Sequence, residues 1–243
     1  MNKTIIECHD LSFSYEEGTR TLNNIFLEVN ENQAVGIIGA NGAGKSTLLR
    51  ILVGLELNIQ GKVRINQIEV NKKNLPAIRS EVGYLFQNSD NQLFTQSVYQ
   101  EIAFGLIHNG LDEKSIYEKV ISSLEIVGIA HLKDKKIYKM SGGEKKMVSI
   151  ASILAMSPKI LLPDEPTIAL DPKNRRTVIN ILNRQNHVKL VASHDLDMIL
   201  DTCESVILMS EGRIICQGPT EEILHNKELL EANGLELPLR YQG

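Results

Sequence analysis

The chain has 243 residues, a net charge of −4, and hydrophobic and charged contents of 42% and 23%. These values are typical of one large α/β domain or of a domain with a modest insertion. The negative net charge argues against non-specific nucleic-acid binding, and no apolar run is long enough to predict a membrane-spanning helix. The first residues do not resemble a signal peptide, and the scattered cysteines Cys8, Cys203 and Cys216 fit neither a disulfide framework nor a metal site.

The first part of the chain predicts short strands, because β-branched and aromatic residues are interrupted by turn residues. We expect strands at residues 5–15, 25–29, 34–38, 62–65 and 81–86. A helix is expected at residues 45–53, directly after a glycine-rich segment.

The pattern changes to helical periodicity at residues 97–156, with breaks at Gly110 and Gly128. Strands return at residues 160–162, 189–192 and 206–209, alternating with helical stretches, and two short polar helices are expected after Gly218. Alternating strands and helices imply a parallel sheet with crossover connections. The helical block between two α/β halves predicts an inserted helical subdomain.

The glycine-rich segment matches the phosphate-binding pattern G-x-x-x-x-G-K-[ST]. Glycines permit positive φ angles and let backbone N–H groups approach phosphate oxygens closely. We expect Lys45 to reach the β- and γ-phosphates of ATP and the Ser46 hydroxyl to bind Mg²⁺. The predicted phosphate-binding loop, or P-loop, comprises Gly39, Ala40, Asn41, Gly42, Ala43, Gly44, Lys45, Ser46 and Thr47.

Two acidic residues, Asp164 and Glu165, follow the predicted strand at residues 160–162. A buried strand that ends in two acids is the Walker B arrangement of P-loop nucleotidases. We expect Asp164 to hold Mg²⁺ through water and Glu165 to act as general base on the attacking water. Pro163 lacks an N–H group and is unusual in a central strand, so we expect it to end the strand early or to shift Asp164.

The segment Ser141-Gly142-Gly143-Glu144 opens a long helical pattern and permits two interpretations. Serine followed three residues later by glutamate is a capping box, which is a structural device. A helix N-terminus with two glycines also offers free N–H groups to an anion. The two interpretations are compatible.

These segments together resemble the ABC family of ATPases. Met140 and the four residues after it resemble the LSGGQ signature, with Met for Leu and Glu for Gln. Other family motifs follow in order and cover nearly the whole chain: Tyr15 as the adenine-stacking aromatic, Gln87 as the Q-loop glutamine, Asp171 as the D-loop aspartate and His194 as the switch histidine. Residues 167–170 replace the usual T-A-G-L, which adds bulk at Ile168.

The resemblance implies an α/β P-loop nucleotidase fold with a RecA-like parallel sheet, an N-terminal antiparallel β-subdomain and an inserted helical subdomain. The implied division is a nucleotide-binding core at residues 1–87 and 158–217, a helical subdomain at 88–157 and a C-terminal helical tail at 218–243. It also implies a sandwich dimer in which Ser141, Gly142, Gly143 and Glu144 of one subunit close over ATP held by the other. The implied catalytic residues are Lys45, Gln87, Glu165 and His194, and the implied Mg²⁺ ligands are Ser46, Gln87 and Asp164.

A more specific resemblance is carried by residues 82–94, which are similar to the V-G-x-V-F-Q-N-P-D-x-Q-L-F segment of energy-coupling factor and cobalt-uptake ATPases. In that group two ATPases, identical or paralogous, lie under a transmembrane scaffold protein, and a separate membrane protein captures a vitamin or a transition-metal ion. The chain is then expected at the cytoplasmic face of the membrane, with Gln92, Leu93 and Phe94 near the groove that receives the scaffold.

Two other functions compete with an importer subunit: a soluble ABC ATPase of DNA repair, chromosome structure or translation, and a module that binds ATP without hydrolysing it. ABC ATPases of DNA repair or chromosome structure carry a long coiled coil between P-loop and signature, and residues 48–140 hold only a compact helical block. Translation-type members usually have two cassettes in one chain. A module that binds ATP without hydrolysis is disfavoured, because Lys45, Asp164, Glu165 and His194 are all present. The sequence does not name the transported substrate or distinguish a homodimer from a heterodimer.

Overall fold

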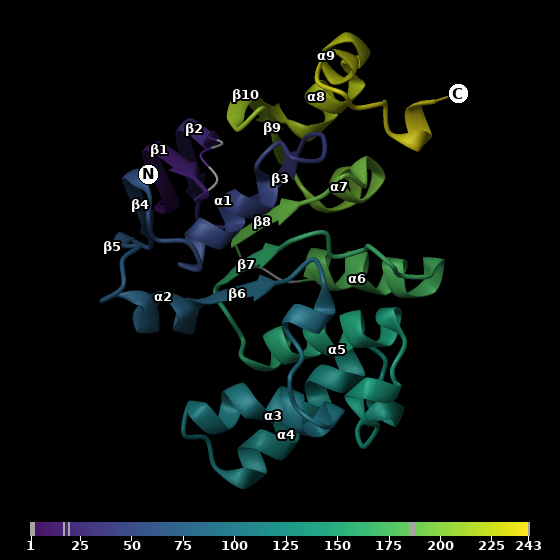
Figure 1. Ribbon diagram of the computed structural model, residues 1–243. Helices are drawn as coiled ribbons and strands as arrows, with labels where there is room; N and C mark the ends of the chain where they lie inside the picture. The colour runs from purple at the N-terminus through teal and green to yellow at the C-terminus, as the bar shows by residue number, and fades with distance from the viewer. Residues whose placement is uncertain (1–2, 17, 19, 185–187, 243) are drawn as a thin grey trace. The chain divides into compact units, whose positions relative to one another are not determined.

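A computed structural model describes residues 3–16, 18, 20–184 and 188–242 of the chain (Figure 1). It divides into two compact units. The first, called the core unit, comprises Met1–Val82, Lys159–Asp164 and Asn186–Gly243. The second, called the helical unit, comprises Gly83–Pro158 and Glu165–Gln185.

An antiparallel sheet in the core unit has the strand order β2-β1-β4-β5. Strand β1 pairs in antiparallel fashion with β2 on one side and β4 on the other, so that Cys8 lies opposite both Leu27 and Val63. One face of this sheet is apolar, because Ile6, Cys8 and Leu11 are buried. The bounds are β1 (Thr4–Ser14), β2 (Arg20–Asn30), β4 (Gln60–Ile65) and β5 (Ile68–Glu69).

The second sheet of the core unit has the order β10-β9-β3-β8-β7. Strands β9, β3, β8 and β7 are parallel, and β10 pairs with β9 in antiparallel fashion. The parallel strands β3 and β8 are buried along their whole length, as expected for strands covered on both faces. The bounds are β3 (Ala34–Ile38), β7 (Ile160–Pro163), β8 (Val188–Ala192), β9 (Ser205–Ser210) and β10 (Arg213–Pro219).

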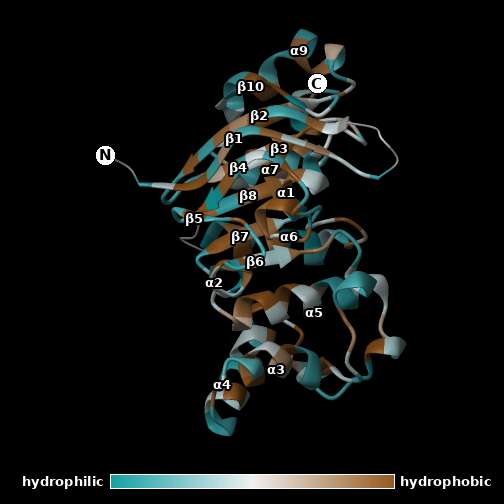
Figure 2. Cartoon of the chain, turned by 60° about the vertical axis from the view of Figure 1, so that its left-hand side comes forward, coloured by the Kyte–Doolittle hydropathy of each residue, from teal (hydrophilic) through white to brown (hydrophobic). Residues whose placement is uncertain are grey.

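Helix α1 (Lys45–Leu52) packs against β2 and β4 of the antiparallel sheet and against β8 of the parallel sheet. Its residues Leu48, Leu49, Ile51 and Leu52 are fully buried, and Figure 2 shows apolar residues concentrated on this helix. The other helices of the core unit are α2 (Leu75–Glu81), α7 (Leu196–Thr202), α8 (Thr220–His225) and α9 (Lys227–Ala232), followed by the short η4 (Leu239–Tyr241).

In the helical unit, α3, α4 and α5 pack against one another around buried residues that include Ile102, Val120 and Met147 (Figure 1). The unit also contains the short turns η1 (Ser89–Asn91), η2 (Ala130–Leu132) and η3 (Ile137–Lys139). Its helices are α3 (Val98–His108), α4 (Glu113–Ile126), α5 (Gly142–Ala155) and α6 (Pro172–Arg184), and β6 (Val82–Leu85) leads into it. Among the described residues, no helix combines the length and the apolar character needed to span a bilayer.

The predicted fold class is confirmed, with a parallel sheet, an antiparallel N-terminal sheet and a block of helices. Strand β3 has the predicted bounds, and the breaks at Gly110 and Gly128 separate α3, α4 and the segment before α5. The prediction missed β10, whose residues alternate between exposed and half-buried positions and give a weak apolar signal. It also extended the strand at residues 81–86 back to Glu81, which is the last residue of α2.

Candidate functional site

The P-loop connects the carboxyl end of β3 to the first residue of α1. Gly39 and Gly44 have φ angles of +150° and +101°, which favour glycine. A Cβ atom on Gly44 would lie 2.7 Å from Leu22 Cδ2, and one on Gly39 would collide with the carbonyl oxygen of Met209. Both the conformation and the close packing therefore require glycine at these positions.

The Lys45 ammonium is held over this loop. Its Nζ donates hydrogen bonds to the carbonyl oxygens of Gly39 at 2.7 Å and Ala40 at 3.1 Å. The side chain is buried, so its charge is concentrated in the concavity that the loop surrounds. A positive helix end and a buried ammonium at one loop form a site for a phosphate anion.

The Ser46 hydroxyl donates a hydrogen bond of 2.9 Å to Oδ1 of Asp164, which is buried. Neighbouring oxygen ligands of an octahedral Mg²⁺ ion, each about 2.0–2.1 Å from the metal, lie about 2.9 Å apart. The hydroxyl and the carboxylate therefore fit a site for Mg²⁺, which phosphate oxygens and water would complete.

Pro163 ends strand β7 but does not displace Asp164 from the edge of the sheet. Strand β7 runs from Ile160 to Pro163, and the next residue still forms a parallel bridge with Ala192 of β8. The strand therefore extends through Pro163 rather than ending early, and the carboxylate lies within hydrogen-bonding distance of Ser46.

Tyr15 lies beside the other end of the P-loop, directly after β1. Its hydroxyl forms a hydrogen bond of 3.3 Å with Thr47 Oγ1, and Phe13 packs edge-on against its ring at 4.8 Å. The residue is 40% exposed, which leaves ring surface available to stack on a planar ligand.

His194 follows strand β8, which lies between β3 and β7 in the sheet. The P-loop, His194 and Asp164 thus leave the carboxyl ends of three adjacent parallel strands, where open α/β sheets bind ligands. The turn is fixed by buried Ser193, whose N–H donates to Ile37 and whose hydroxyl accepts from the N–H of Asp195. We call Tyr15, the P-loop, Asp164 and His194 the P-loop half-site.

The remaining predicted residues lie in the helical unit: Gln87, Ser141, Gly142, Gly143, Glu144, Glu165 and Asp171. We call Ser141, Gly142, Gly143 and Glu144 the signature half-site. Ser141 is the N-cap of α5 and forms the predicted capping box, in which Ser141 Oγ accepts from Glu144 N at 3.2 Å and Glu144 Oε2 accepts from Ser141 N at 2.8 Å. Ser141 and Gly142 are nevertheless exposed, so the capped helix end remains accessible to an anion.

Glu144, which replaces the usual glutamine of the signature, is neutralised locally. Lys135 Nζ lies 2.7 and 2.9 Å from its two carboxylate oxygens. The hydrogen bond from Lys135, followed by that from the N–H of Ser141, holds the pKa of Glu144 below its usual range. The ion pair reduces the repulsion that a free carboxylate would exert on an incoming phosphate.

Gln87 lies in an exposed loop that three side chains attach to α5. Buried Lys146 donates hydrogen bonds to the carbonyl oxygens of Phe86 at 3.0 Å and Gln87 at 2.8 Å. Gln92 donates to the carbonyl oxygen of Ser149 at 3.0 Å, and Lys145 forms an ion pair of 2.6 Å with Asp90. Their sequence separations of 55 to 60 residues give no local pattern.

Glu165 and Asp171 flank a tight segment. Glu165 is buried and has a φ angle of +50°, and Ala169 has a φ of +63°, so two non-glycine residues adopt the left-handed region. Asp171 begins α6 by accepting hydrogen bonds from the N–H and side-chain amide of Asn174 at 2.9 and 2.8 Å. A Cβ atom on Gly143 would lie 3.4 Å from the carbonyl oxygen of Ala169, which places this segment beside the signature.

A cavity of about 290 Å³ opens between these loops of the helical unit. It connects the Q-loop, the N-terminal end of α5 and the segment before α6. The lining residues are Gln87, Asn88, Ser89, Asp90, Gly142, Lys145, Lys146, Ile168 and Ala169.

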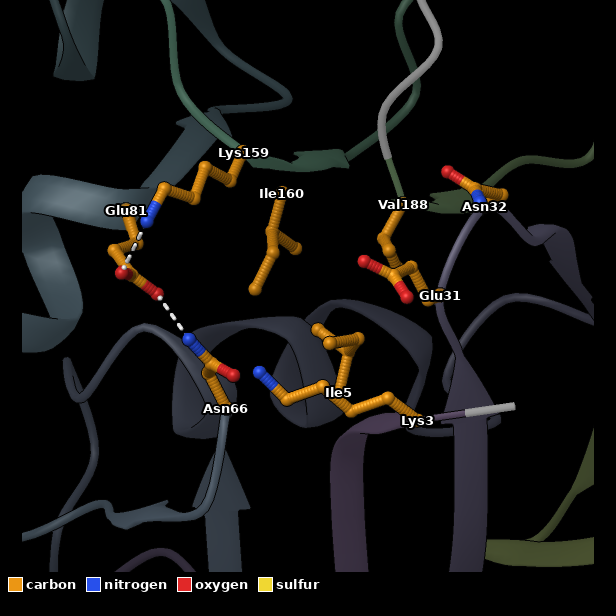
Figure 3. Close-up of a pocket in the computed structure, with 9 residues that line it drawn as sticks. All are labelled: Lys3, Ile5, Glu31, Asn32, Asn66, Glu81, Lys159, Ile160 and Val188. Carbon is orange, nitrogen blue, oxygen red and sulfur yellow. Dashed lines mark hydrogen bonds and ion pairs between the residues drawn. The ribbon is translucent and has the colours of Figure 1, made fainter. Parts of the chain in front are cut away.

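Figure 3 shows a second cavity, of about 370 Å³, in the core unit. Its wall includes Ile160 and Val188, the first residues of β7 and β8, so it lies at the amino ends of the parallel strands. The P-loop half-site lies at their carboxyl ends. The second cavity is therefore separate from the candidate nucleotide site.

The cysteines take no part in either half-site. Burial raises the pKa of the Cys8 thiol to about 12 and that of the Cys203 thiol to about 11. Both therefore remain protonated at neutral pH and are poor nucleophiles, and Cys216 is half-buried.

Comparison with known proteins identifies the family. The model of the ABC transporter family matches residues 22–168. The chain belongs to the ABC transporter family. Its relatives include the energy-coupling factor transporter ATP-binding protein EcfA of Methanothermobacter thermautotrophicus, which is 41% identical over 96% of this chain and 77% of that protein.

Two solved ABC structures are similar to the chain. CbiO1 from Clostridium perfringens, part of the ABC transporter complex CbiONQ, has a TM-score of 0.81 and 35% identity, covering 95% of this chain and 94% of its own. The ATP-binding cassette MJ0796, solved as a dimer after hydrolysis with ADP and phosphate bound, has a TM-score of 0.83 and 25% identity, covering 89% and 99%.

This ABC protein is therefore the ATP-binding, ATP-hydrolysing subunit of a transporter. Within the core unit the structure brings together Tyr15, the P-loop and Asp164. Within the helical unit it brings the Q-loop, the signature and the segment around Ala169 to one cavity.

Proposed function

We propose that this ABC ATPase is the motor subunit of an energy-coupling-factor-type importer, at the cytoplasmic face of the membrane. ATP binding and hydrolysis in a sandwich dimer would drive uptake of a vitamin or a transition-metal ion such as cobalt. The observation that carries the hydrolytic part is the Ser46–Asp164 pair beside buried Lys45. The similarity to EcfA and to CbiO1 supports the importer part.

Hydrolysis would proceed by positioning and charge stabilisation. The P-loop amides and Lys45 hold the β- and γ-phosphates, and Tyr15 stacks on adenine. The water oxygen attacks the γ-phosphorus while Glu165 accepts the water proton, and the bond to the β-phosphate oxygen of ADP breaks. Gln87 and His194 orient the water and the γ-phosphate.

Mg²⁺ would neutralise charge on the phosphate oxygens when bound. Ser46 and Asp164 would hold it, with Gln87 as a further ligand. The oxygens of Ser46 and Asp164, 2.9 Å apart, support the assignment of these two residues.

A second subunit would complete each nucleotide site. Ser141, Gly142, Gly143 and Glu144 of one subunit would bind the γ-phosphate held by its partner's P-loop, and Asp171 would lie at the dimer seam. Exposure of Ser141 and Gly142 at the capped end of α5 supports this arrangement, because a buried helix end could not receive a ligand from outside. The dimeric state of the similar cassette MJ0796 also supports it.

An exposed aromatic patch on the helical unit supports docking to a membrane scaffold. Phe94 and Phe104 pack edge-on at 4.8 Å, yet they are 67% and 52% exposed, and Ile107, one turn further along α3, is 61% exposed. We call these three residues the docking patch. Gln92 and Leu93 instead face inwards, so among the three residues predicted near the groove Phe94 would contact the scaffold. A clustered apolar surface favours an apolar helix as partner.

The alternatives are an ATPase of another ABC importer or, less favoured, a non-transport ABC ATPase. Between the P-loop and the signature, the helices that the structure describes are at most 14 residues long and pack compactly, whereas a repair or chromosome ATPase needs a long coiled coil there.

Steady-state ATP turnover of the assembled complex tests the catalytic assignment. Glu165→Gln should reduce turnover by about 10²-fold or more and leave ATP binding intact, since it removes a general base without altering the P-loop. Equal turnover rates for the parent chain and the Glu165→Gln variant would overturn the assignment of Glu165 as base.

Affinity purification from detergent-solubilised membranes tests the importer assignment. A multi-span scaffold and a small substrate-capture protein should co-purify with the chain. Recovery of a soluble complex in their place would contradict the proposal, and the genes beside this one provide an independent check of both partners.

A further inference from the structure

The last residues of the core unit run from the P-loop to the helix that follows His194. We call residues 233–242 the C-terminal strap. At one end, a Cβ atom built on Gly234 would lie 3.6 Å from Cβ of Ala40 in the P-loop. At the other end, η4 contacts α7, and Figure 1 shows the terminal segment beside that helix.

The strap is hydrogen-bonded to α7 through the carboxylate of Asp197. The N–H groups of Leu239 and Arg240 donate to its Oδ2 and Oδ1 at 2.8 and 3.2 Å, and Arg240 Nε donates to Oδ1 at 3.2 Å. Arg240 Nη2 also lies 2.6 Å from Asp201 Oδ1, one turn further along the helix. The guanidinium thus spans α7 from its first turn to its last.

The strap also contacts helix α8 through Tyr241. Tyr241 donates a hydrogen bond of 2.6 Å to Glu221 in α8, and its ring stacks on His225 at 3.8 Å. Individual exposed ion pairs contribute little, but several converging bonds between fixed elements restrict motion more effectively. The strap is therefore fastened to both α7 and α8.

Helix α7 depends on tertiary contacts, because a helix of seven residues is not stable alone in water, and the strap adds to its packing against β3 and α8. Its N-cap is Asp195, the residue after His194, and Asp195 Oδ1 accepts from Met198 N at 2.9 Å. Any movement of the first turn of α7 is therefore transmitted to the neighbouring histidine through one peptide unit.

We propose that the C-terminal strap positions His194 for ATP hydrolysis by holding α7, and that Arg240 is the positioning residue. The inference rests on the role proposed above for His194. Arg240 acts on the rate of the chemical step rather than on nucleotide affinity, because its side chain bonds to Asp197 and Asp201 of α7 and not to the P-loop.

The test compares Arg240→Ala with the parent chain in ATP turnover, in binding of a fluorescent ATP analogue and in thermal melting. We expect kcat to fall about fivefold or more with less than a twofold change in analogue Kd, since misplacement of a catalytic group by about 1 Å can cost up to 10²-fold. The matched control is Lys227→Ala, which removes an exposed cation 3.7 Å from Glu231 in α9, away from α7, and should leave both values unchanged.

A double-mutant cycle distinguishes positioning from general destabilisation. In a His194→Ala background, single-turnover hydrolysis should not fall further when Arg240→Ala is added, because the strap acts through the missing imidazole. The same fold-loss in both backgrounds would overturn the proposal, as would an unchanged kcat in Arg240→Ala. If Arg240→Ala lowers the melting temperature strongly, Asp201→Asn replaces it in the same cycle.

The outcomes also separate this inference from the proposed function. If His194→Ala alone leaves turnover unchanged, the role of His194 fails. If His194→Ala lowers turnover and the strap variants do not, only the strap proposal fails.

Discussion

The Lys146 ammonium lies 2.8 Å from the carbonyl oxygen of Gln87, so the signature helix holds the Q-loop by its backbone. The same Nζ atom binds the carbonyl of Phe86 at 3.0 Å, and the lysine is only 2% exposed. A buried cation bound to two carbonyl oxygens is costly to remove, because those oxygens lose their partner. These two hydrogen bonds join the Q-loop to the N-terminal part of α5, so we expect the two segments to move together.

We predict that Lys146→Met lowers the free energy of unfolding by about 1–3 kcal/mol, because two part-buried carbonyl groups lose their charged hydrogen-bond donor. ATP turnover should also fall, because Gln87 is no longer held in place. Urea titration and an ATPase assay measure the two effects. The matched control is Lys145→Met, which breaks an exposed pair with Asp90 and should cost at most about 1 kcal/mol. Equal losses for the two variants would contradict the role given to Lys146.

Ala169 occupies a backbone conformation that favours glycine. Its φ angle is +63°, and the left-handed region costs an L-residue about 1–2 kcal/mol, partly offset by the larger unfolded-state entropy of glycine. Ala169→Gly should therefore raise the free energy of unfolding by up to about 1 kcal/mol. Chemical denaturation measures the change.

A control alanine lies in the interior of α5. Ala151→Gly should lower stability by about 1 kcal/mol or more, since glycine is unfavourable in a helix. A loss of stability in both variants would show that Ala169 is not strained.

The Glu81–Lys159 ion pair predicts a pH-dependent contribution to stability. Lys159 Nζ lies 2.8 Å from the carboxylate, and Asn66 donates to its other oxygen at 3.1 Å (Figure 3). The hydrogen bond from Lys159 is the main reason that the pKa of Glu81 is lowered. A lowered pKa in the folded state stabilises the protein above the unfolded pKa of about 4.3, and this contribution is lost as pH falls through the folded value.

Glu81→Gln should therefore reduce stability at pH 7 by at most about 1 kcal/mol, as expected for an accessible pair. The difference from the parent chain should shrink as the pH falls below about 4, which denaturation at several pH values measures. Glu118→Gln is the control, because its exposed pair with Lys114 is 3.9 Å long and should contribute less. A difference that grows at low pH would contradict the sign.

The two half-sites differ in how far the sequence predicted them. The conformation of the P-loop was predictable, because its glycines and Lys45 meet local requirements of one continuous loop. The capping box at Ser141 was predictable for the same reason. The Ser46–Asp164 contact joins residues 118 positions apart, so its distance required the folded sheet.

Other features gave no sequence signal. Lys146 looks like an ordinary surface residue of a charged helix start, and only packing shows that it is buried. Arg240 meets Asp197 across 43 residues, and no local pattern predicts that contact. The left-handed φ of Glu165 was also not predictable, because a glutamate does not favour that conformation.

The docking patch gives the last prediction. Phe94, Phe104 and Ile107 expose apolar surface although neighbouring residues of α3 such as Ile102 and Leu106 are buried. If a membrane scaffold covers the patch, Phe94→Ser with Phe104→Ser should abolish or strongly reduce recovery of the scaffold in pull-downs. ATP binding should be unchanged, because the substitutions leave the P-loop intact.

A matched control for the docking patch is Tyr138→Ser, since Tyr138 is an exposed aromatic residue of the same unit that lies in η3 rather than on α3. This variant should retain the scaffold. Thermal melting of the double variant should stay close to that of the parent chain, because both aromatic side chains are more than half exposed. Full recovery of the scaffold by the double variant would show that the membrane partner binds elsewhere. An equal loss in Tyr138→Ser would show that the interface extends across the unit and is not specific to the docking patch.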